Sequence, residues 1–346
     1  MKSNRSYTKL AGALALLSSV TLTAQTAMAA EPSHLEHPHG AGTFMIEASY
    51  MRMNMDGLRA GTTDVSKADA TAMMGDYKHM MVPTTMTMDM FMLMPMYNFT
   101  KDFSVMLMLN YLNNDMKMEG MCNSSMSTSG LGDTQASFSY KFMDGQFAAS
   151  MDVNVPTGSI DEKTKMKMMM MGSCMEMEMQ APYAMQLGSG TYDFTPSLTY
   201  LGGYYSWKYG AQVSYKYRTG ENDNNYTLGN EANAKMWVRK PFMGVTWAGE
   251  LDVKRWGAID GKDPKISTAS QNMTMMGGAT TVAMLPSPTN FPANYGGTLA
   301  NVDLSASIPV GMAYVLGKVS IPVYQDLNGL QMKHSTGWTV GVGAMF

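Results

Sequence analysis

The sequence is poor in charge, in cysteine and in long apolar runs. Only 15% of its 346 residues are charged, whereas about 25% is typical of globular proteins. Its net charge of −3 provides no basic surface, so we expect no nucleic-acid partner. Two cysteines are too few for a disulfide scaffold. Because no run of about 20 apolar residues occurs, the chain offers no membrane-spanning helix.

The first 29 residues have the pattern of a signal peptide. Lys2, Arg5 and Lys9 precede an apolar run over residues 10–20. Residues 27–29, Ala-Met-Ala, form a small-residue cleavage site. Residues 30–43 then predict a short periplasmic lead. An exported chain without a spanning helix can enter a membrane only as strands.

The last twelve residues predict a strand that runs to the chain end. Its apolar side chains share one parity and its small or polar side chains share the other, which is the period of a β-strand. The apolar set is Trp338, Val340, Val342, Ala344 and Phe346, and the opposite set includes Thr339, Gly341 and Gly343. An apolar strand at a free edge invites aggregation, and pairing with the first strand removes that edge. We expect Gly341 and Gly343 to leave space in the lumen.

About twelve such alternating segments occur between residues 44 and 346, and their connections alternate between long and short. The long connections cover about residues 56–83, 113–130, 156–190 and 257–297, with a further loop over residues 325–334 before the last strand. This asymmetry is typical of outer-membrane barrels. We therefore predict an all-β fold, a closed antiparallel transmembrane β-barrel, in the outer membrane of a Gram-negative bacterium. Its partners would be membrane lipid and the barrel-assembly machinery.

All five histidines fall outside the predicted strands: His34, His37, His39, His79 and His334. The first three would form either a periplasmic metal site or a solvated lead. No histidine on a strand argues against a Ser-His hydrolase in the barrel wall, and we predict that the chain is not an enzyme.

Methionine occurs 42 times, and much of it falls on the parity that we assign to the lumen. The predicted lumen residues are Met88, Met90, Met92, Met94, Met106, Met108, Glu47, Asp193, Lys216, Arg218, Glu250 and Asp252. The methionines would form a relay for a soft cation, a slide for an apolar solute, or an adaptable packing layer. The charges would set pore selectivity. Asp89 then points outward and must lie at or above the membrane edge.

The connection over residues 156–190 holds the densest sulfur segment. The candidate metal ligands are Met166, Met168, Met169, Met170, Met171, Cys174, Met175, Met177 and Met179. Thioethers and thiols are soft ligands, so copper is the metal that we associate with them, and we expect no other cofactor. The alternatives are a flexible apolar loop or an oxidant sink. Cys122 and Cys174 fall in neighbouring loops, where export favours a disulfide over joint metal ligation.

Several stretches resemble a family of Gram-negative outer-membrane transporters assigned to the phenol meta-cleavage degradation pathway. The matching stretches are residues 56–62, 129–133, 156–163, 186–193, 220–224, 255–260 and 322–329. The resemblance implies a barrel and the passage of aromatic compounds. The sulfur-rich residues 165–179 depart from the family pattern.

We therefore predict an outer-membrane channel or transporter that binds or passes soft metal ions. The alternatives are uptake of small apolar or aromatic compounds and a non-transporting structural barrel.

Overall fold

A computed structural model describes residues 40–170, 173–274 and 281–346 of the chain. The predicted signal peptide and most of the predicted lead, including His34, His37 and His39, lie outside these residues. Within the described part of the chain, no helix is long and apolar enough to cross a membrane.

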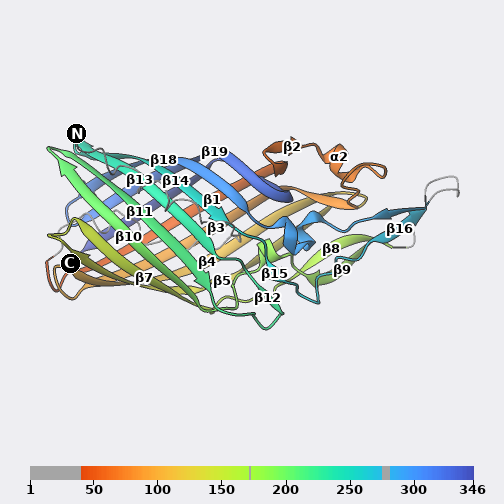
Figure 1. The fold of residues 1–346 in the computed structure, drawn as a ribbon, viewed down its shortest axis with the longest axis horizontal. Helices are drawn as coiled ribbons and strands as arrows, with labels where there is room; N and C mark the ends of the chain where they lie inside the picture. The colour runs from red at the N-terminus through yellow and green to blue at the C-terminus, as the bar shows by residue number, and fades with distance from the viewer. Residues whose placement is uncertain (1–39, 171–172, 275–280) are drawn as a thin grey trace, which may run out of the picture.

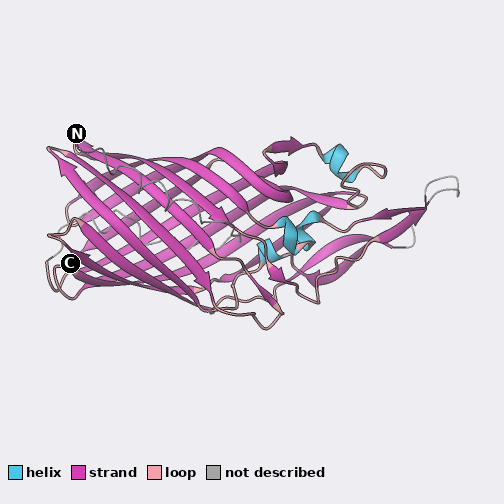
Figure 2. Cartoon of the chain, viewed as in Figure 1, coloured by secondary structure: helices cyan, strands magenta, loops and turns pink. Residues whose placement is uncertain are grey.

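Twelve antiparallel strands form a closed barrel, as the sequence predicted (Figures 1 and 2). They are β1 (Phe44–Gly61), β3 (Met81–Asn98), β4 (Phe103–Gly120), β6 (Thr134–Phe142), β7 (Phe147–Val155), β10 (Asp193–Tyr204), β11 (Trp207–Arg218), β13 (Glu231–Phe242), β14 (Val245–Trp256), β18 (Gly297–Val310), β19 (Ala313–His334) and β20 (Gly337–Met345). Each strand pairs with its neighbours in sequence, and β1 pairs with both β3 and β20 to close the ring.

Alternation of side chains gives the barrel an apolar exterior and a filled interior. On β3, Phe91, Leu93 and Tyr97 are exposed on the outer face, whereas the methionines between them are buried. Aromatic residues gather at the short turns, where Phe142 and Phe147 stack with ring centroids 5.8 Å apart. Such aromatic girdles mark the membrane interfaces of outer-membrane barrels. The end with short turns is therefore the periplasmic end, at the left of Figure 1.

The long connections form a cap of short elements at the extracellular end, at the right of Figure 1. They are β2 (Thr63–Val65), α2 (Lys67–Thr71), β5 (Ser124–Leu131), β8 (Lys163–Met170), β9 (Ser173–Gln180), η1 (Tyr183–Met185), β12 (Tyr226–Thr227), β15 (Asp260–Gly261), β16 (Gln271–Thr274), β17 (Thr281–Met284), η2 (Pro288–Asn290) and η3 (Pro292–Asn294). Two predicted loops are shorter than expected. β1 and β3 extend into the loop predicted over residues 56–83, and the loop predicted over residues 113–130 is mainly the β4–β5 hairpin.

The predicted loop over residues 325–334 is wrong, because β19 continues through it. Gly297 pairs with Leu327 on one side of this strand, and Met55 pairs with His334 on the other. Both pairings are antiparallel, so the chain reverses direction between Leu327 and His334, where Gly329 has φ +55°. The last extracellular connection is therefore a tight turn inside β19, and the alternation of long and short connections fails at this point.

The two ends of the described barrel meet at one seam. The backbone N–H groups of Phe44 and Phe346 each donate to the other residue's carbonyl oxygen, at 3.1 and 2.8 Å. Their rings stack with centroids 6.3 Å apart. The terminal strand thus closes the ring at the periplasmic rim, as its alternation predicted.

The Asp89 side chain points outward and is paired with neighbouring side chains on β1. Its carboxylate accepts from Arg52 at 2.6 and 2.7 Å and from the Tyr50 hydroxyl at 2.6 Å. Tyr50 also packs against Phe91 and Trp338, with ring centroids 4.7 and 5.2 Å away. Charge on a lipid-facing surface is costly near the bilayer centre. The ion pair therefore marks the upper edge of the lipid-facing band.

Candidate functional site

One wall of the lumen consists of methionine side chains from β1, β3, β4 and β5; we call it the methionine wall. Each of the six methionines predicted for the lumen is buried there, at 4% exposure or less. They belong to one cluster of buried apolar residues that also contains Met45, Met51, Met81, Met86, Met96, Met116, Met118, Met126, Met166, Met185 and Met332. Met116 and Met118 continue the parity of Met106 and Met108, so the alternation could have identified them.

The registers of the strands place these methionines side by side. Met45, Met51, Met53 and Met55 on β1 face Met96, Met90, Met88 and Met86 on β3, and Met96 and Met86 in turn face Met106 and Met116 on β4. Directly opposed positions on adjacent strands are about 5 Å apart at Cβ. The thioethers therefore form a column with neighbours both along and across the strands.

The predicted metal loop is a two-stranded hairpin of β8 and β9 that continues this column upward. Register pairs Met166 with Met177 and Met168 with Met175, and it pairs Thr164 with Met179, so all these side chains share one face. Met166 is buried in the cluster, and Met168 and Met179 pack against it. Met175 and Met177 remain 53% and 42% exposed.

Two of the other predicted ligands, Met169 and Cys174, do not join this face, although Met169 also packs against the edge of the cluster. Met169 pairs with Cys174 on the opposite face, beside the Lys165–Glu178 and Lys167–Glu176 pairs. Cys174 forms a disulfide with Cys122, with Cα atoms 5.8 Å apart. The prediction of Cys174 as a metal ligand is therefore wrong, because its sulfur is not a thiol.

Two of the predicted ligands cannot be placed in this way. Met171 lies outside the described residues. Met170 ends β8, where its backbone pairs with Ser173.

The opposite wall of the lumen consists of interlocked charges from β10, β11, β13, β14, β18 and β19; we call it the charged wall. Arg218 lies between Asp193 and Glu231, with N–O distances of 2.5 and 3.0 Å. Its guanidinium also donates to the carbonyl of Gly229 at 2.7 Å. The Arg218 and Asp193 side chains are 1% and 0% exposed. Such a buried charge requires its partners to remain in place.

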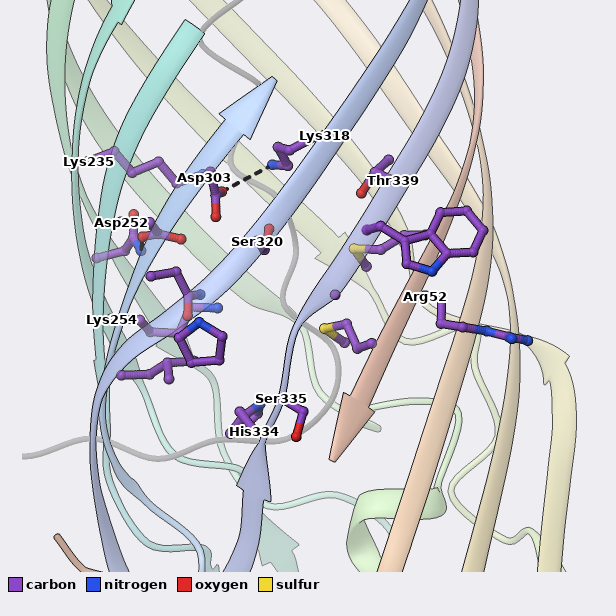
Figure 3. Close-up of a pocket in the computed structure, with 18 of the residues that line it drawn as sticks. Arg52, Lys235, Asp252, Lys254, Asp303, Lys318, Ser320, His334, Ser335 and Thr339 are labelled. Carbon is purple, nitrogen blue, oxygen red and sulfur yellow. Dashed lines mark hydrogen bonds and ion pairs between the residues drawn. The ribbon is translucent and has the colours of Figure 1, made fainter. Parts of the chain in front are cut away.

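Further pairs extend the charged wall toward the periplasm. Lys235 lies 3.8 Å from Glu250, and Lys318 lies 3.5 Å from Asp303 (Figure 3). Asp252 accepts from the Asn233 amide at 2.5 Å, and Lys216 is 3% exposed beside these groups. All the charges that the sequence assigned to this wall therefore face the lumen.

A cavity of about 140 Å³ lies between the two walls (Figure 3). Met51 and Met53 border it on one side, and Lys235 and Lys254 border it on the other. The cavity is thus lined by soft sulfur and by fixed charge together.

Two residues at this level differ from expectation. His334 was predicted in a loop, but it ends β19 and lines the cavity, with its ring 6.4 Å from that of Trp256. The space expected beside Gly343 is occupied by Tyr314, because a Cβ at Gly343 would lie 2.3 Å from that ring. The Tyr314 hydroxyl donates to Glu47. The sequence held no signal for this contact, because Tyr314 on β19 reaches across Gly343 on β20 to Glu47 on β1.

Within the described part of the chain, no group of three or more His, Cys, Asp or Glu side chains is arranged to hold a metal ion. Hard and borderline cations such as Ca²⁺ and Zn²⁺ need such ligands.

Comparison with known proteins identifies the fold. No family model and no curated protein sequence matches this chain. An outer membrane channel from Pseudomonas putida F1 aligns over 89% of this chain and 97% of its own, with a TM-score of 0.58 and 13% sequence identity. This chain has the fold of an outer-membrane β-barrel. The predicted fold class and outer-membrane location are confirmed.

Two other solved barrels are less similar. The CymD monoaromatic hydrocarbon channel aligns over 89% of each chain, with a TM-score of 0.45 and 6% identity. The translocator domain of the autotransporter NalP from Neisseria meningitidis aligns over 91% of this chain and 92% of its own, with a TM-score of 0.44 and 10% identity. Neither is similar enough to inform the function of this outer-membrane barrel.

Proposed function

We propose that this barrel is an outer-membrane channel for soft metal cations, with copper(I) as the cargo. The residue choice on β3 and β4 carries the proposal. Toward lipid these strands present Phe91, Leu93, Leu107 and Leu109, whereas toward the lumen they present methionine at nearly every apolar position. Both sets are apolar, but only the thioether can ligate a metal.

The continuity of the sulfur column supports passage rather than storage. Buried methionines extend from Met96 near the periplasmic turns to Met166 in the extracellular hairpin. Inward-facing positions on one strand repeat about every 7 Å, and opposed positions are closer. A cation held by two or three sulfurs can therefore exchange ligands with the next group without regaining a full hydration shell.

The charged wall supports a channel in a second way. Acidic and basic side chains alternate along it, from the Arg218 cluster to the Lys318–Asp303 pair. Mixed rings of charge tune selectivity in membrane pores. The exposed Met175 and Met177 at the hairpin would meet the cation first.

Flux into liposomes tests this proposal. The purified barrel is reconstituted around a copper(I)-chelating dye, and uptake is compared between the wild type and a Met88→Leu/Met90→Leu/Met92→Leu variant. Leucine keeps the volume and the apolarity but removes the sulfur. We expect copper(I) uptake in the wild type and a large loss in the variant. A Met151→Leu/Met236→Leu variant, altered on the lipid face, is the matched control and should retain uptake.

Calorimetry of copper(I) binding with and without residues 165–179 separates the hairpin from the column. Weaker binding after the deletion supports capture by the hairpin. Equal and negligible binding by both proteins would overturn the metal hypothesis.

Uptake of small apolar or aromatic molecules is the second candidate, because the methionine wall is also a continuous apolar surface. Phenol flux discriminates between the two. If the barrel takes up apolar molecules, leucine serves as well as methionine, so the Met88→Leu/Met90→Leu/Met92→Leu variant should keep phenol flux. Under the same hypothesis, copper(I) should not pass through the wild type. Absence of flux for both solutes would favour a non-transporting structural barrel.

A further inference from the structure

A second methionine cluster lies in the extracellular cap, outside the column; we call it the cap cluster. Met80 and Met284 are buried, at 7% and 0% exposure. Met73, Met121 and Met273 are partly buried and pack against them, with Val282. These residues come from the α2–β3 connection, the β4–β5 turn, β16 and β17. Segments far apart in sequence therefore deliver thioethers to one place.

Backbone hydrogen bonds fix these segments together. The N–H of Met121 donates to the carbonyl of Met80 at 2.8 Å, and the N–H of Met80 donates to the carbonyl of Leu285 at 2.8 Å. Gly120 permits this close approach, because a Cβ there would lie 2.3 Å from the Met80 carbonyl oxygen. The positions of the sulfur-bearing residues thus do not depend on sulfur packing alone.

The neighbouring apolar clusters of the cap show that methionine is not a general filler there. One consists of Leu58, Ala70, Val82 and Leu330, and the other consists of Tyr183, Tyr226, Leu228, Ile259, Ile266 and Tyr295. Neither contains methionine among its described members. Adaptable packing would be equally useful in all three clusters, so it does not explain the concentration of sulfur in one.

We propose that the cap cluster binds one soft cation, copper(I) or silver(I), through thioether sulfur. Such ligands select soft metals and do not satisfy Zn²⁺ or Ca²⁺. The proposal of this binding site depends only on the packing and the hydrogen bonds of the cap cluster. Its role as a second binding site at the extracellular entrance of the channel rests on the proposed function.

The cap cluster is one residue away from the sulfur column at two places, the start of β3 and the β4–β5 turn. Met80 belongs to the cap cluster and Met81 to the column, and Met121 and Cys122 are divided in the same way. The Cys174 Sγ lies 3.6 Å from the carbonyl oxygen of Met121. A cation leaving the cap cluster would therefore meet the head of the column next.

Silver(I) binding to the full-length barrel in detergent tests the site, because silver(I) is a soft cation without copper's redox chemistry. Bound silver per chain is counted for the wild type, for Met80→Leu/Met284→Leu, and for the lipid-face control Met151→Leu/Met236→Leu. We expect the cap variant to lose one bound silver(I) and the control to lose none. Unchanged stoichiometry and affinity in the cap variant would overturn the proposal.

A second measurement uses the wild-type protein, so a folding defect in the substituted protein cannot affect it. Hydrogen peroxide oxidises accessible methionine to the sulfoxide, and a metal-bound sulfur is protected. Mass spectrometry of peptides from the wild type should show several-fold slower oxidation of Met73, Met121 and Met273 with one silver(I) per chain, and no slowing with zinc(II). Equal rates with and without silver(I) would exclude the site.

The same experiments separate this site from the channel. The Met88→Leu/Met90→Leu/Met92→Leu variant should still protect the cap methionines with silver(I). Protection without copper(I) flux in the wild type would reject the channel and retain the cap site. Copper(I) flux in the wild type without silver(I) protection of the cap methionines would reject the cap site and retain the channel.

Discussion

The two walls of the lumen follow the same strand pattern but are held together differently. The methionine wall fills its space with flexible apolar side chains, which need no fixed direction to pack. The charged wall holds Arg218 between Asp193 and Glu231, with each charge depending on the others. The methionine wall should therefore tolerate changes in side-chain shape, whereas the charged wall should not tolerate the loss of a charged partner.

Removing Arg218 should produce the largest effect. Arg218→Met leaves Asp193 and Glu231 buried without their shared cation, and breaking a buried pair in this way costs about 3–5 kcal/mol. We expect a comparable loss in the free energy of unfolding, measured by urea titration in lipid vesicles. Met90→Leu, on the opposite wall, is the control. Equal losses from both substitutions would remove the distinction between the walls.

The disulfide joins the hairpin to the top of the methionine wall, and its removal should have the next largest effect. Cys122→Ser/Cys174→Ser should destabilise the hairpin by about 2–4 kcal/mol, the usual range for a native disulfide. Trypsin should then cleave at Lys165 or Lys167, while the barrel strands stay resistant. Wild-type protein treated with dithiothreitol should give the same fragments, and an unchanged digest would show that packing alone holds the hairpin.

Leucine in the methionine wall should have a smaller effect on stability. Volume-conserving apolar substitutions usually cost less than about 1.5 kcal/mol each. Met92→Leu should therefore change the urea midpoint only slightly. Met92→Lys, which puts a charge among apolar groups, should by contrast prevent folding or abolish metal uptake. A large loss from the leucine substitution would mean that this wall is as demanding as the charged wall.

Acid should produce the smallest of these effects, in the cap. Lys265 beside Asp161, with Asn224, holds the pKa of that carboxyl below its usual value. A depressed pKa stabilises the folded state above the unfolded value of about 3.9, and this contribution is lost as the pH falls through the folded value. The protection factors for hydrogen exchange in residues 156–162, which correct for the intrinsic pH dependence of exchange, should therefore fall from pH 5 to pH 3. Asp161→Asn should remove this difference.

The alternation of side chains was enough to predict the barrel, its closure and the direction of every lumen side chain named beforehand. It failed where strands leave the membrane. Outward positions there are polar, as at Asn113, Asp115 and Lys117, so the apolar outward face that identifies a membrane strand ends. The connection predicted over residues 325–334 was too long, although Asn328-Gly329 is a strong hairpin signal, because a register shift near Ala300 disrupts the alternation beside it.

The cap cluster could not be predicted from the sequence. Its members come from two connections and from the short strands β16 and β17, and they have no common spacing. The β3–β4 register places Met80 beside Met121, and the docking of β16 and β17 then adds Met284. The Cys122–Cys174 pairing was accessible to sequence reasoning because only two cysteines exist.

The ion pair of Arg52 and Asp89 has a consequence for where a solute would lose its water. The pair ends the lipid-facing band on β1 and β3, so the strands beyond it stand clear of the bilayer. Met86, Met116 and Met118 lie in this protruding section. The part of the sulfur column that holds these methionines is therefore surrounded by protein and not by lipid. A cation that used the column would exchange its hydration water for sulfur ligands above the bilayer.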